Sequence, residues 1–122
     1  MSKKILIVDD EVDIVGILSM VLQAHGYEIL IAPTGPEAIA RTLREEPDLI
    51  LLDIKMPGLD GYEVIEGLKQ LTQTSKIPII FVSALPREEV ARKVKELGAT
   101  DYIPKPFESE EVVAKVKKAL GE

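Results

Sequence analysis

The sequence has no cysteine, no tryptophan and a single histidine. Without cysteine the chain can form no disulfide, no thiolate metal site and no thiol nucleophile. One histidine is too few to build a zinc site, so any bound metal would be held mainly by oxygen ligands. The sequence also lacks an apolar run of the roughly 20 residues that a membrane helix needs. Zinc, thiol and membrane-spanning functions are therefore excluded before any motif is considered.

The chain also lacks a basic surface and a targeting segment. Its formal net charge is −6 and its lysines are interleaved with glutamates, so the sequence shows no basic patch that could attract nucleic acid or anionic membranes. The apolar run at residues 5–8 is too short for a signal peptide, and no small-residue cleavage site follows it. We therefore expect a cytoplasmic protein that binds neither nucleic acid nor membrane directly.

Short apolar runs alternate with longer amphipathic stretches along the 122 residues. The apolar runs predict strands near residues 4–9, 28–32, 48–53, 78–83 and 100–104. The amphipathic stretches predict helices near residues 11–25, 35–45, 60–72, 86–97 and 108–120. Strands that alternate with helices imply a parallel sheet, and continuous β-branched runs are typical of strands buried on both faces. We predict one α/β domain over residues 1–122, a doubly wound five-stranded parallel sheet with five helices in the flavodoxin-like order 2-1-3-4-5.

Capping patterns support the predicted helix boundaries. Thr34 and Glu37 form a T-x-x-E capping box, and Asp60 and Glu63 form the analogous D-x-x-E pair. Gly98 stands where the helix near residues 86–97 should end. These signals agree with the helix boundaries that the hydrophobic pattern predicts.

The chemically rich residues stand at the ends of four predicted strands. They are Asp9, Asp10 and Glu11 after the first strand, Asp53 after the third, Ser83 after the fourth and Lys105 after the fifth. In open α/β sheets, function gathers beyond the carboxyl ends of the strands. These four strand ends are neighbours in the order 2-1-3-4-5, so we expect their side chains to converge.

The residue types in this cluster suit phosphoryl chemistry. The carboxylates of Asp9, Asp10 and Asp53 would repel one another unless a cation intervened, and Mg²⁺ is favoured because it needs few protein ligands beside its waters. A phosphoryl group bound there would have its charge neutralised by the metal, a lysine partner and a hydroxyl donor. Lys105 and Ser83 stand where they can supply the last two. Asp53 would be the nucleophile and would form an acyl phosphate.

Each of these residues has a plainer explanation when it is taken alone. Asp10 could cap the following helix, and Asp53 could be a turn aspartate. Ser83 could be a loop hydroxyl, and Lys105 a solvated loop lysine. Their coincidence at one end of a single sheet favours a functional site. His25 is interpreted as a helix C-terminal residue favoured by the helix dipole, and without a histidine base beside Ser83 a serine hydrolase is disfavoured.

The motifs together resemble the receiver domains of bacterial two-component response regulators, including the single-domain chemotaxis type. The resemblance covers essentially the whole chain. It rests on I-L-I-V-D-D-E at residues 5–11, L-L-D-I-K-M-P-G-L-D-G at 51–61, V-S-A at 82–84 and Y-I-P-K-P-F at 102–107. Each motif is moderately specific, whereas their order and spacing together are highly specific.

The resemblance implies a role for each residue at a matching position. Asp53 would be phosphorylated by a sensor histidine kinase or a phosphotransfer protein. Asp10 and Asp53 would bind Mg²⁺ directly, Asp9 would act through water, and the backbone carbonyl of Lys55 would add a further ligand. Lys105 would pair with the phosphoryl group.

The resemblance also implies a switch. Ser83 would move toward the phosphoryl group, and Tyr102 would swing inward with it. Phosphorylation adds about −1.5 to −2 charges, and Ser83 and Lys105 would bind that form better, so the mechanism would be a population shift. The fourth helix, fifth strand and fifth helix would form the output face toward a downstream domain or protein. Such a chain is a phosphoacceptor signalling protein rather than an enzyme, although it takes part in its own phosphotransfer and dephosphorylation.

Two other functions are compatible with this fold: a binding module and a hydrolase. A binding module on the same fold that no longer switches would lack a pocket residue, and none is missing here. A hydrolase of the related aspartyl-phosphate kind would need an acid two positions after the nucleophile, where this chain has Lys55. In the family that position tunes dephosphorylation, so the lifetime of the phosphoryl group stays open.

Overall fold

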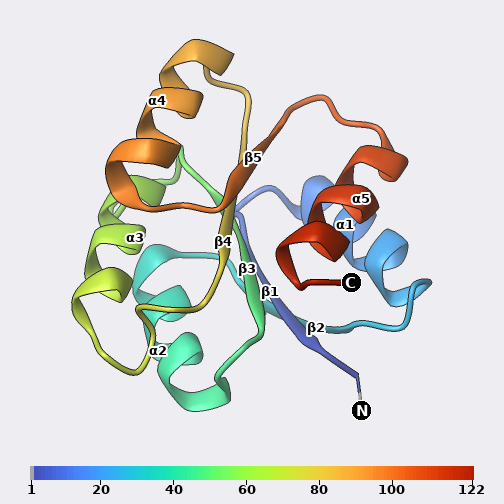
Figure 1. Ribbon diagram of the computed structural model, residues 1–122, viewed down its shortest axis with the longest axis horizontal. Coiled ribbons are helices and arrows are strands. Elements are labelled where there is room, and N and C mark those ends of the chain that lie inside the picture. Colours follow the sequence, from blue (N-terminus) through green and yellow to red (C-terminus); the bar gives the residue numbers. More distant parts are fainter. Residues whose placement is uncertain (1) are drawn as a thin grey trace.

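The computed structural model describes residues 2–122, and Figure 1 shows the arrangement of their helices and strands. The elements in chain order are β1 (Lys4–Val8), α1 (Val12–Gln23), β2 (Glu28–Ala32), α2 (Gly35–Glu45), β3 (Leu49–Asp53), α3 (Gly61–Gln70), β4 (Ile79–Ser83), α4 (Arg87–Leu97), β5 (Asp101–Pro104) and α5 (Ser109–Ala119). The five strands form one parallel sheet in the order β2-β1-β3-β4-β5. The predicted fold class and strand order are therefore confirmed.

The helices cover both faces of the sheet, with α1 and α5 on one side and α2, α3 and α4 on the other (Figure 1). Successive side chains of a strand point to opposite faces. Leu6 and Val8 of β1 therefore join the core under α2, α3 and α4, whereas Ile5 and Ile7 join the core under α1 and α5. This two-sided burial explains why the strands of the sheet interior are continuous apolar runs in the sequence.

The predicted helix caps form where the sequence places them. The side chain of Asp60 accepts a hydrogen bond from the backbone N–H of Glu63 (2.9 Å), and the side chain of Glu63 accepts one from the N–H of Asp60 (3.0 Å). The hydroxyl of Thr34 accepts from the N–H of Glu37 (3.3 Å) at the start of α2. Gly98 ends α4 in the left-handed region, with φ of 77°.

Several helix ends differ from the prediction by one or two residues. Glu11 was expected in the first helix but is the extended residue before it (φ −87°, ψ 111°), because its N–H donates to the side chain of Asp9 (2.9 Å). The third helix ends at Gln70, since Leu71 is extended and the hydroxyl of Thr74 donates to the carbonyl of Leu68 (2.5 Å). Local hydrogen bonds of this kind compete with the helical ones and are hard to predict from periodicity.

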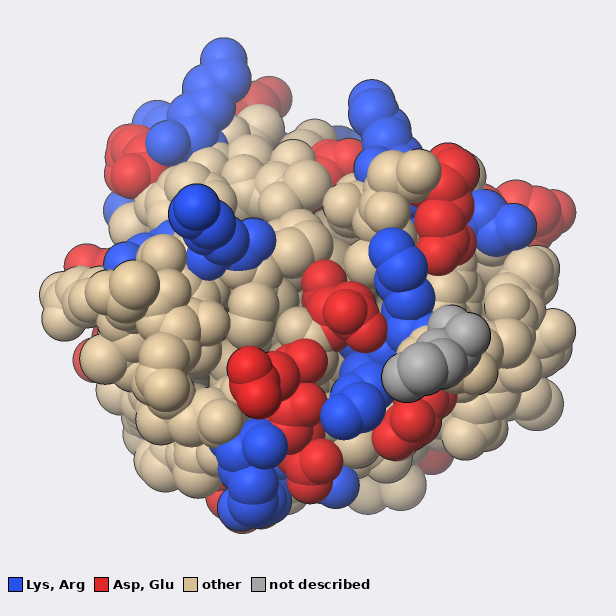
Figure 2. Space-filling view, turned by 60° about the horizontal axis from the view of Figure 1, so that its bottom comes forward, with Lys and Arg blue, Asp and Glu red and all other residues tan. Residues whose placement is uncertain are grey.

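Charges of both signs are mixed on the surface. Figure 2 shows one face of the molecule, on which lysine and arginine side chains lie among aspartates and glutamates. Some ion pairs join neighbouring turns of one helix. Lys93 pairs with Glu96 within α4 (3.2 Å), and Lys115 pairs with Glu111 within α5 (3.5 Å). In the part of the chain from residue 2 onward, no helix combines the length and the hydropathy that spanning a membrane requires.

Candidate functional site

Three carboxylates meet at the carboxyl end of the sheet. Asp9 and Asp10 follow β1 directly, and Asp53 is the last residue of β3. The two strands are parallel neighbours with Val8 opposite Leu52, so the next residues of each strand come together. One carboxylate oxygen from each of the three aspartates lies within 4.8 Å of the other two. Asp9 and Asp53 are buried, whereas Asp10 is exposed to solvent.

Lys105 brings a positive charge to this cluster from the far edge of the sheet. Its backbone N–H donates to the carbonyl of Ser83 (2.9 Å), which continues the pairing of β4 with β5 by one residue. Its ammonium nitrogen lies 3.1 Å from Asp9 Oδ2, 2.9 Å from Glu11 Oε1 and 3.6 Å from Asp53 Oδ1. The lysine therefore spans the distance from β5 to β1.

The local backbone after Asp53 is tightly constrained. The N–H of Gly61, the first residue of α3, donates to the carbonyl of Ile54 (2.8 Å) and closes the intervening loop. A Cβ atom on Gly61 would lie 2.7 Å from the Cα atom of Ile54 and would also collide with the carbonyl oxygen of Asp53. Only glycine lets the start of α3 approach the strand end this closely. The packing of α3 thus fixes the backbone that carries the Asp53 side chain.

Burial and the neighbouring carboxylate of Asp9 raise the pKa of Asp53 from 3.8 to about 6. The ammonium of Lys105 and a hydrogen bond from the backbone of Ile54 act in the opposite direction but do not cancel the rise. The ionised form of such a buried carboxylate is stabilised by any further cation nearby. The electrostatics therefore favour a bound metal ion or an added proton.

Burial disfavours the charge of Lys105, but the hydrogen bond to Glu11 and the carboxylates of Asp53 and Asp9 outweigh it and raise the pKa of Lys105 above its ordinary value. The side chain is therefore an ammonium ion at neutral pH. A fixed ammonium beside these carboxylates can pair with a further anionic group that enters the pocket.

The donor set of the cluster fits magnesium. Its members are hard carboxylate oxygens, and the repulsion that raises the pKa of Asp53 would be relieved by a divalent cation. Both oxygens of Asp9 already have partners, because Oδ1 accepts from the N–H of Glu11 (2.9 Å) and Oδ2 from Lys105 (3.1 Å). The acidic cluster is thus compatible with a magnesium site.

A cavity of about 320 Å³ opens beside Asp53. Its lining residues are Glu11, Asp53, Lys55, Ser83, Ala84, Leu85 and Lys105. Ser83 is buried at the end of β4, and its hydroxyl oxygen accepts a hydrogen bond from the N–H of Leu85 (3.0 Å). The structure thus brings together the predicted residues Asp53, Lys55, Ser83 and Lys105 around one space that a phosphoryl group can enter.

Tyr102 lies apart from this group. Its half-buried side chain packs against the core under α2, α3 and α4, and it is not among the residues that line the cavity beside Asp53. The ammonium of Lys115 lies 5.0 Å above its ring and also donates to its backbone carbonyl. Tyr102 therefore packs at the β5 edge of the sheet, where Lys115 of α5 contacts it, and lies outside the cavity in this conformation.

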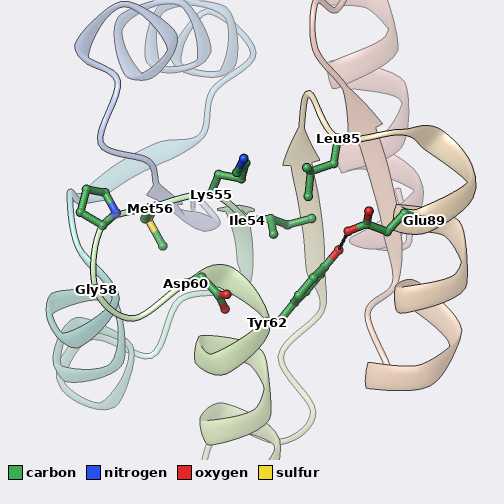
Figure 3. Close-up of a pocket in the computed structure, with 9 residues that line it drawn as sticks. Ile54, Lys55, Met56, Gly58, Asp60, Tyr62, Leu85 and Glu89 are labelled. Carbon is green, nitrogen blue, oxygen red and sulfur yellow. Dashed lines mark hydrogen bonds between the residues drawn. The ribbon is translucent and has the colours of Figure 1, made fainter.

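A larger cavity of about 540 Å³ adjoins the first one and is shown in Figure 3. It lies between the loop after β3 and the start of α4, and the hydroxyl of Tyr62 on α3 donates across it to Glu89 on α4 (3.1 Å). Lys55 and Leu85 line both cavities. No motif predicted the Tyr62–Glu89 contact, since the two residues are 27 positions apart and belong to different elements.

Comparisons with known proteins agree with this architecture. The family model described as response regulator receiver domain matches residues 5–117. The alkaline phosphatase synthesis transcriptional regulatory protein PhoP of Bacillus subtilis is 46% identical over 122 residues, which are 98% of this chain and 49% of that protein. A putative response regulator of Chloroflexus aurantiacus has a TM-score of 0.95 and 34% identity, with 100% of both chains covered. Chemotaxis protein CheY4 of Vibrio cholerae has a TM-score of 0.92 and 31% identity, with 98% of this chain and 100% of that chain covered.

A doubly wound parallel sheet with an acidic cluster and a lysine at its carboxyl edge defines a signalling domain of the receiver class. The chain belongs to the family of response regulator receiver domains found in two-component systems. It spans about half the length of the curated relatives it matches. The resemblance drawn from the sequence motifs is thereby confirmed at the level of the family.

Proposed function

We propose that the chain is a phosphorylation-dependent signalling switch that accepts a phosphoryl group on Asp53 from a sensor histidine kinase or a phosphotransfer protein. One observation carries the proposal. Carboxylate oxygens of Asp9, Asp10 and Asp53 lie within 4.8 Å of one another, and the ammonium of Lys105 lies 3.6 Å from Asp53 Oδ1. This combination supplies a nucleophile, a metal-binding oxygen set and a fixed positive charge in one pocket.

In the transfer step, a carboxylate oxygen of Asp53 attacks the phosphorus atom of a phosphohistidine. A P–O bond forms to Asp53 while the P–N bond of the donor breaks, and the electron pair of that bond stays on the histidine nitrogen. The product is an acyl phosphate. With its pKa raised to about 6, Asp53 is still mostly ionised at pH 7, so the nucleophile needs no general base.

Asp10, Asp53 and the backbone carbonyl of Lys55 would bind magnesium directly, and Asp9 would act through a water molecule. The exposure of Asp10 suits direct binding, and the existing hydrogen bonds of Asp9 suit an indirect role. When bound, magnesium neutralises charge on the oxygens of the transferring phosphoryl group. Lys105 would pair with another of those oxygens.

Ser83 and Tyr102 would form the switch. The hydroxyl oxygen of Ser83 accepts a bond from Leu85, so its proton is available to donate to a phosphoryl oxygen. Phosphorylation would favour the conformer in which Ser83 moves toward the phosphoryl group and the half-buried Tyr102 swings further inward. The face formed by α4, β5 and α5 would then pass the signal to an output domain or protein.

The test is modification by a small phosphodonor. The full chain is incubated with acetyl phosphate and magnesium, and intact mass spectrometry measures the addition of one phosphoryl group. The parent chain should gain the group, and Asp53→Asn should not. Asp48→Asn serves as the matched control, because Asp48 precedes β3 at the opposite end of the same strand. If Asp53→Asn is modified as fully as the parent, Asp53 is not the acceptor.

Magnesium dependence provides a second readout. Chelation with EDTA should abolish modification, and beryllofluoride, which imitates a phosphoryl group on a carboxylate, should bind only when magnesium is present. A chain that binds neither magnesium at millimolar concentration nor beryllofluoride would instead be a binding module on the receiver fold.

A further inference from the structure

The ammonium of Lys105 has three carboxylate neighbours of two kinds. Asp9 and Asp53 belong to the buried acidic cluster, and their side chains are 2% and 5% exposed. Glu11 stands at the rim of the pocket, where its side chain is 60% exposed, and its carboxylate is not part of that cluster. The ammonium of Lys105 therefore contacts carboxylates both in the interior of the pocket and at its rim.

The distances show which neighbours hold the ammonium. Glu11 is closest at 2.9 Å and Asp9 follows at 3.1 Å, whereas Asp53 at 3.6 Å lies outside hydrogen-bond range. Burial lowers the pKa of Lys105, and the hydrogen bond to Glu11 is the strongest of the contacts that raise it. Glu11 and Asp9 are thus the two carboxylates that hold the charged side chain in its present place.

The local backbone explains why the Glu11 side chain is available for this contact. Glu11 is the N-cap residue of α1, yet its side chain makes no capping hydrogen bond. N-cap side chains usually accept a bond from the first turn of the helix. Instead, the N–H of Glu11 is fixed by Asp9 Oδ1 at 2.9 Å, and the carboxylate reaches Lys105. The backbone bond to Asp9 orients Glu11 toward the pocket.

An ammonium ion and a divalent cation compete for the same oxygens. Lys105 donates to Asp9 Oδ2 and lies near Asp53 Oδ1, and both aspartates belong to the cluster that is compatible with magnesium. Any contact that draws the ammonium toward the rim weakens its hold on these carboxylates. Glu11 is the described carboxylate outside the cluster that makes such a contact with Lys105.

We propose that Glu11 is a positioning residue that holds the Lys105 ammonium at the rim of the pocket and thereby favours magnesium binding by the aspartates. This inference rests on the proposed function, because it takes the aspartate cluster as the magnesium site. Without Glu11, the carboxylates left beside the ammonium among residues 2–122 would be Asp9 and Asp53, and the ammonium would oppose the metal more strongly.

The experiment measures the magnesium affinity of the full unphosphorylated chain by calorimetric titration with magnesium chloride. Exposed ion pairs contribute little, so Glu11→Gln should weaken magnesium binding about two- to fivefold. Loss of one negative charge weakens cation binding in any case, so a matched control is needed. Asp13→Asn removes the same charge from the exposed first turn of α1, and it should change the affinity less.

A double-mutant cycle separates the action through Lys105 from simple charge. In the Lys105→Met background, the effect of Glu11→Gln should fall to that of Asp13→Asn, because the ammonium that Glu11 positions is gone. Circular dichroism and urea unfolding of all variants establish that they are folded. A structural role of Glu11 would lower stability equally in both backgrounds and would not produce this pattern.

Two results would overturn the proposal. In one, Glu11→Gln and Asp13→Asn weaken magnesium binding equally; in the other, the larger effect of Glu11→Gln persists without Lys105. Either result means that Glu11 acts through its charge alone. A parent chain that binds no magnesium at millimolar concentration is a different failure, because it overturns the magnesium-dependent proposed function itself.

Discussion

Asp53 is a buried carboxylate beside another carboxylate, so replacing it with asparagine should change stability in a way that depends on pH. Asparagine has the shape of the protonated acid and carries no charge. The pKa of Asp53 is raised from 3.8 to about 6 in the folded chain. Between pH 4 and 6 the folded state therefore binds more protons than the unfolded state, and the contribution of Asp53 to stability falls as the pH rises.

The magnitude follows from the size of the shift. A rise from 3.8 to about 6 corresponds to an upper limit of about 3 kcal/mol of destabilisation when Asp53 is ionised. Water that reaches the pocket reduces this figure, so we expect Asp53→Asn to be about 1–3 kcal/mol more stable than the parent at pH 8. The difference should shrink as the pH falls from 6 to 4 and disappear only below pH 4, where the carboxyl of Asp53 becomes protonated in the unfolded state as well as in the folded one.

The assay is urea unfolding followed by circular dichroism, at several pH values between 4 and 8, first with EDTA and then in a separate series with magnesium and no EDTA. The difference between parent and variant cancels the titration of the other groups. Magnesium at millimolar concentration should then stabilise the parent but not the variant, because binding to the folded state shifts the equilibrium. Equal stability of parent and Asp53→Asn at pH 8 would refute the electrostatic picture of the pocket.

Three further substitutions and one control, Gly16→Ala, test how the site is supported. Gly61→Ala should lower the free energy of unfolding by about 1–3 kcal/mol, since the added methyl group collides with the backbone after Asp53, whereas Gly16→Ala, which meets no atom within 4 Å, should raise it by about 0.5–1 kcal/mol. Tyr62→Phe should cost about 0.5–1.5 kcal/mol because the hydrogen bond to Glu89 is lost. Asp60→Ala should cost about 0.5–2 kcal/mol because the capping box of α3 is lost. Urea unfolding at pH 7 measures all of them.

Each of these expectations has an outcome that contradicts it. A neutral Gly61→Ala would mean that α3 can move away from the Asp53 loop without cost. Unchanged stability in Tyr62→Phe would mean that water replaces the bond to Glu89 equally well. The same phenol offers an optical check, since burial and the bond to Glu89 raise the pKa of Tyr62 to about 12 and its ionisation should therefore come late in an alkaline titration.

Much of the site could be predicted from the sequence because parallel strands impose a simple geometry. All strands of such a sheet end at the same edge, so residues that follow neighbouring strands must be close. Asp53 is 44 positions after Asp9 and 52 positions before Lys105 along the chain, yet the strand order alone brings the three residues together. The apolar runs located the strands, since strands buried on both faces tolerate few polar residues, and the succession of five βα units favoured the order 2-1-3-4-5.

The contacts made by side chains could not be predicted in the same way. Three contacts illustrate this: the ion pair of Lys105 with Glu11, the bond from Leu85 to the Ser83 hydroxyl and the bond from Tyr62 to Glu89. Each depends on an interatomic separation that must be right to within a few tenths of an ångström. Such separations are set by how the helices and loops pack, and residue order carries little information about them.

The sequence by itself thus determined the class of fold, because hydrophobic periodicity is a local property of the chain. It also predicted the strand order and the convergence of the acidic residues with Lys105, because five successive βα units are typical of that order and parallel strands all end at one edge of the sheet. Only the tertiary structure decided that Tyr102 lies away from the cavity in this conformation and that Glu11 holds the ammonium at the rim. Hydrogen bonds are short-ranged and directional, so the choice between competing partners is made only when all elements are packed.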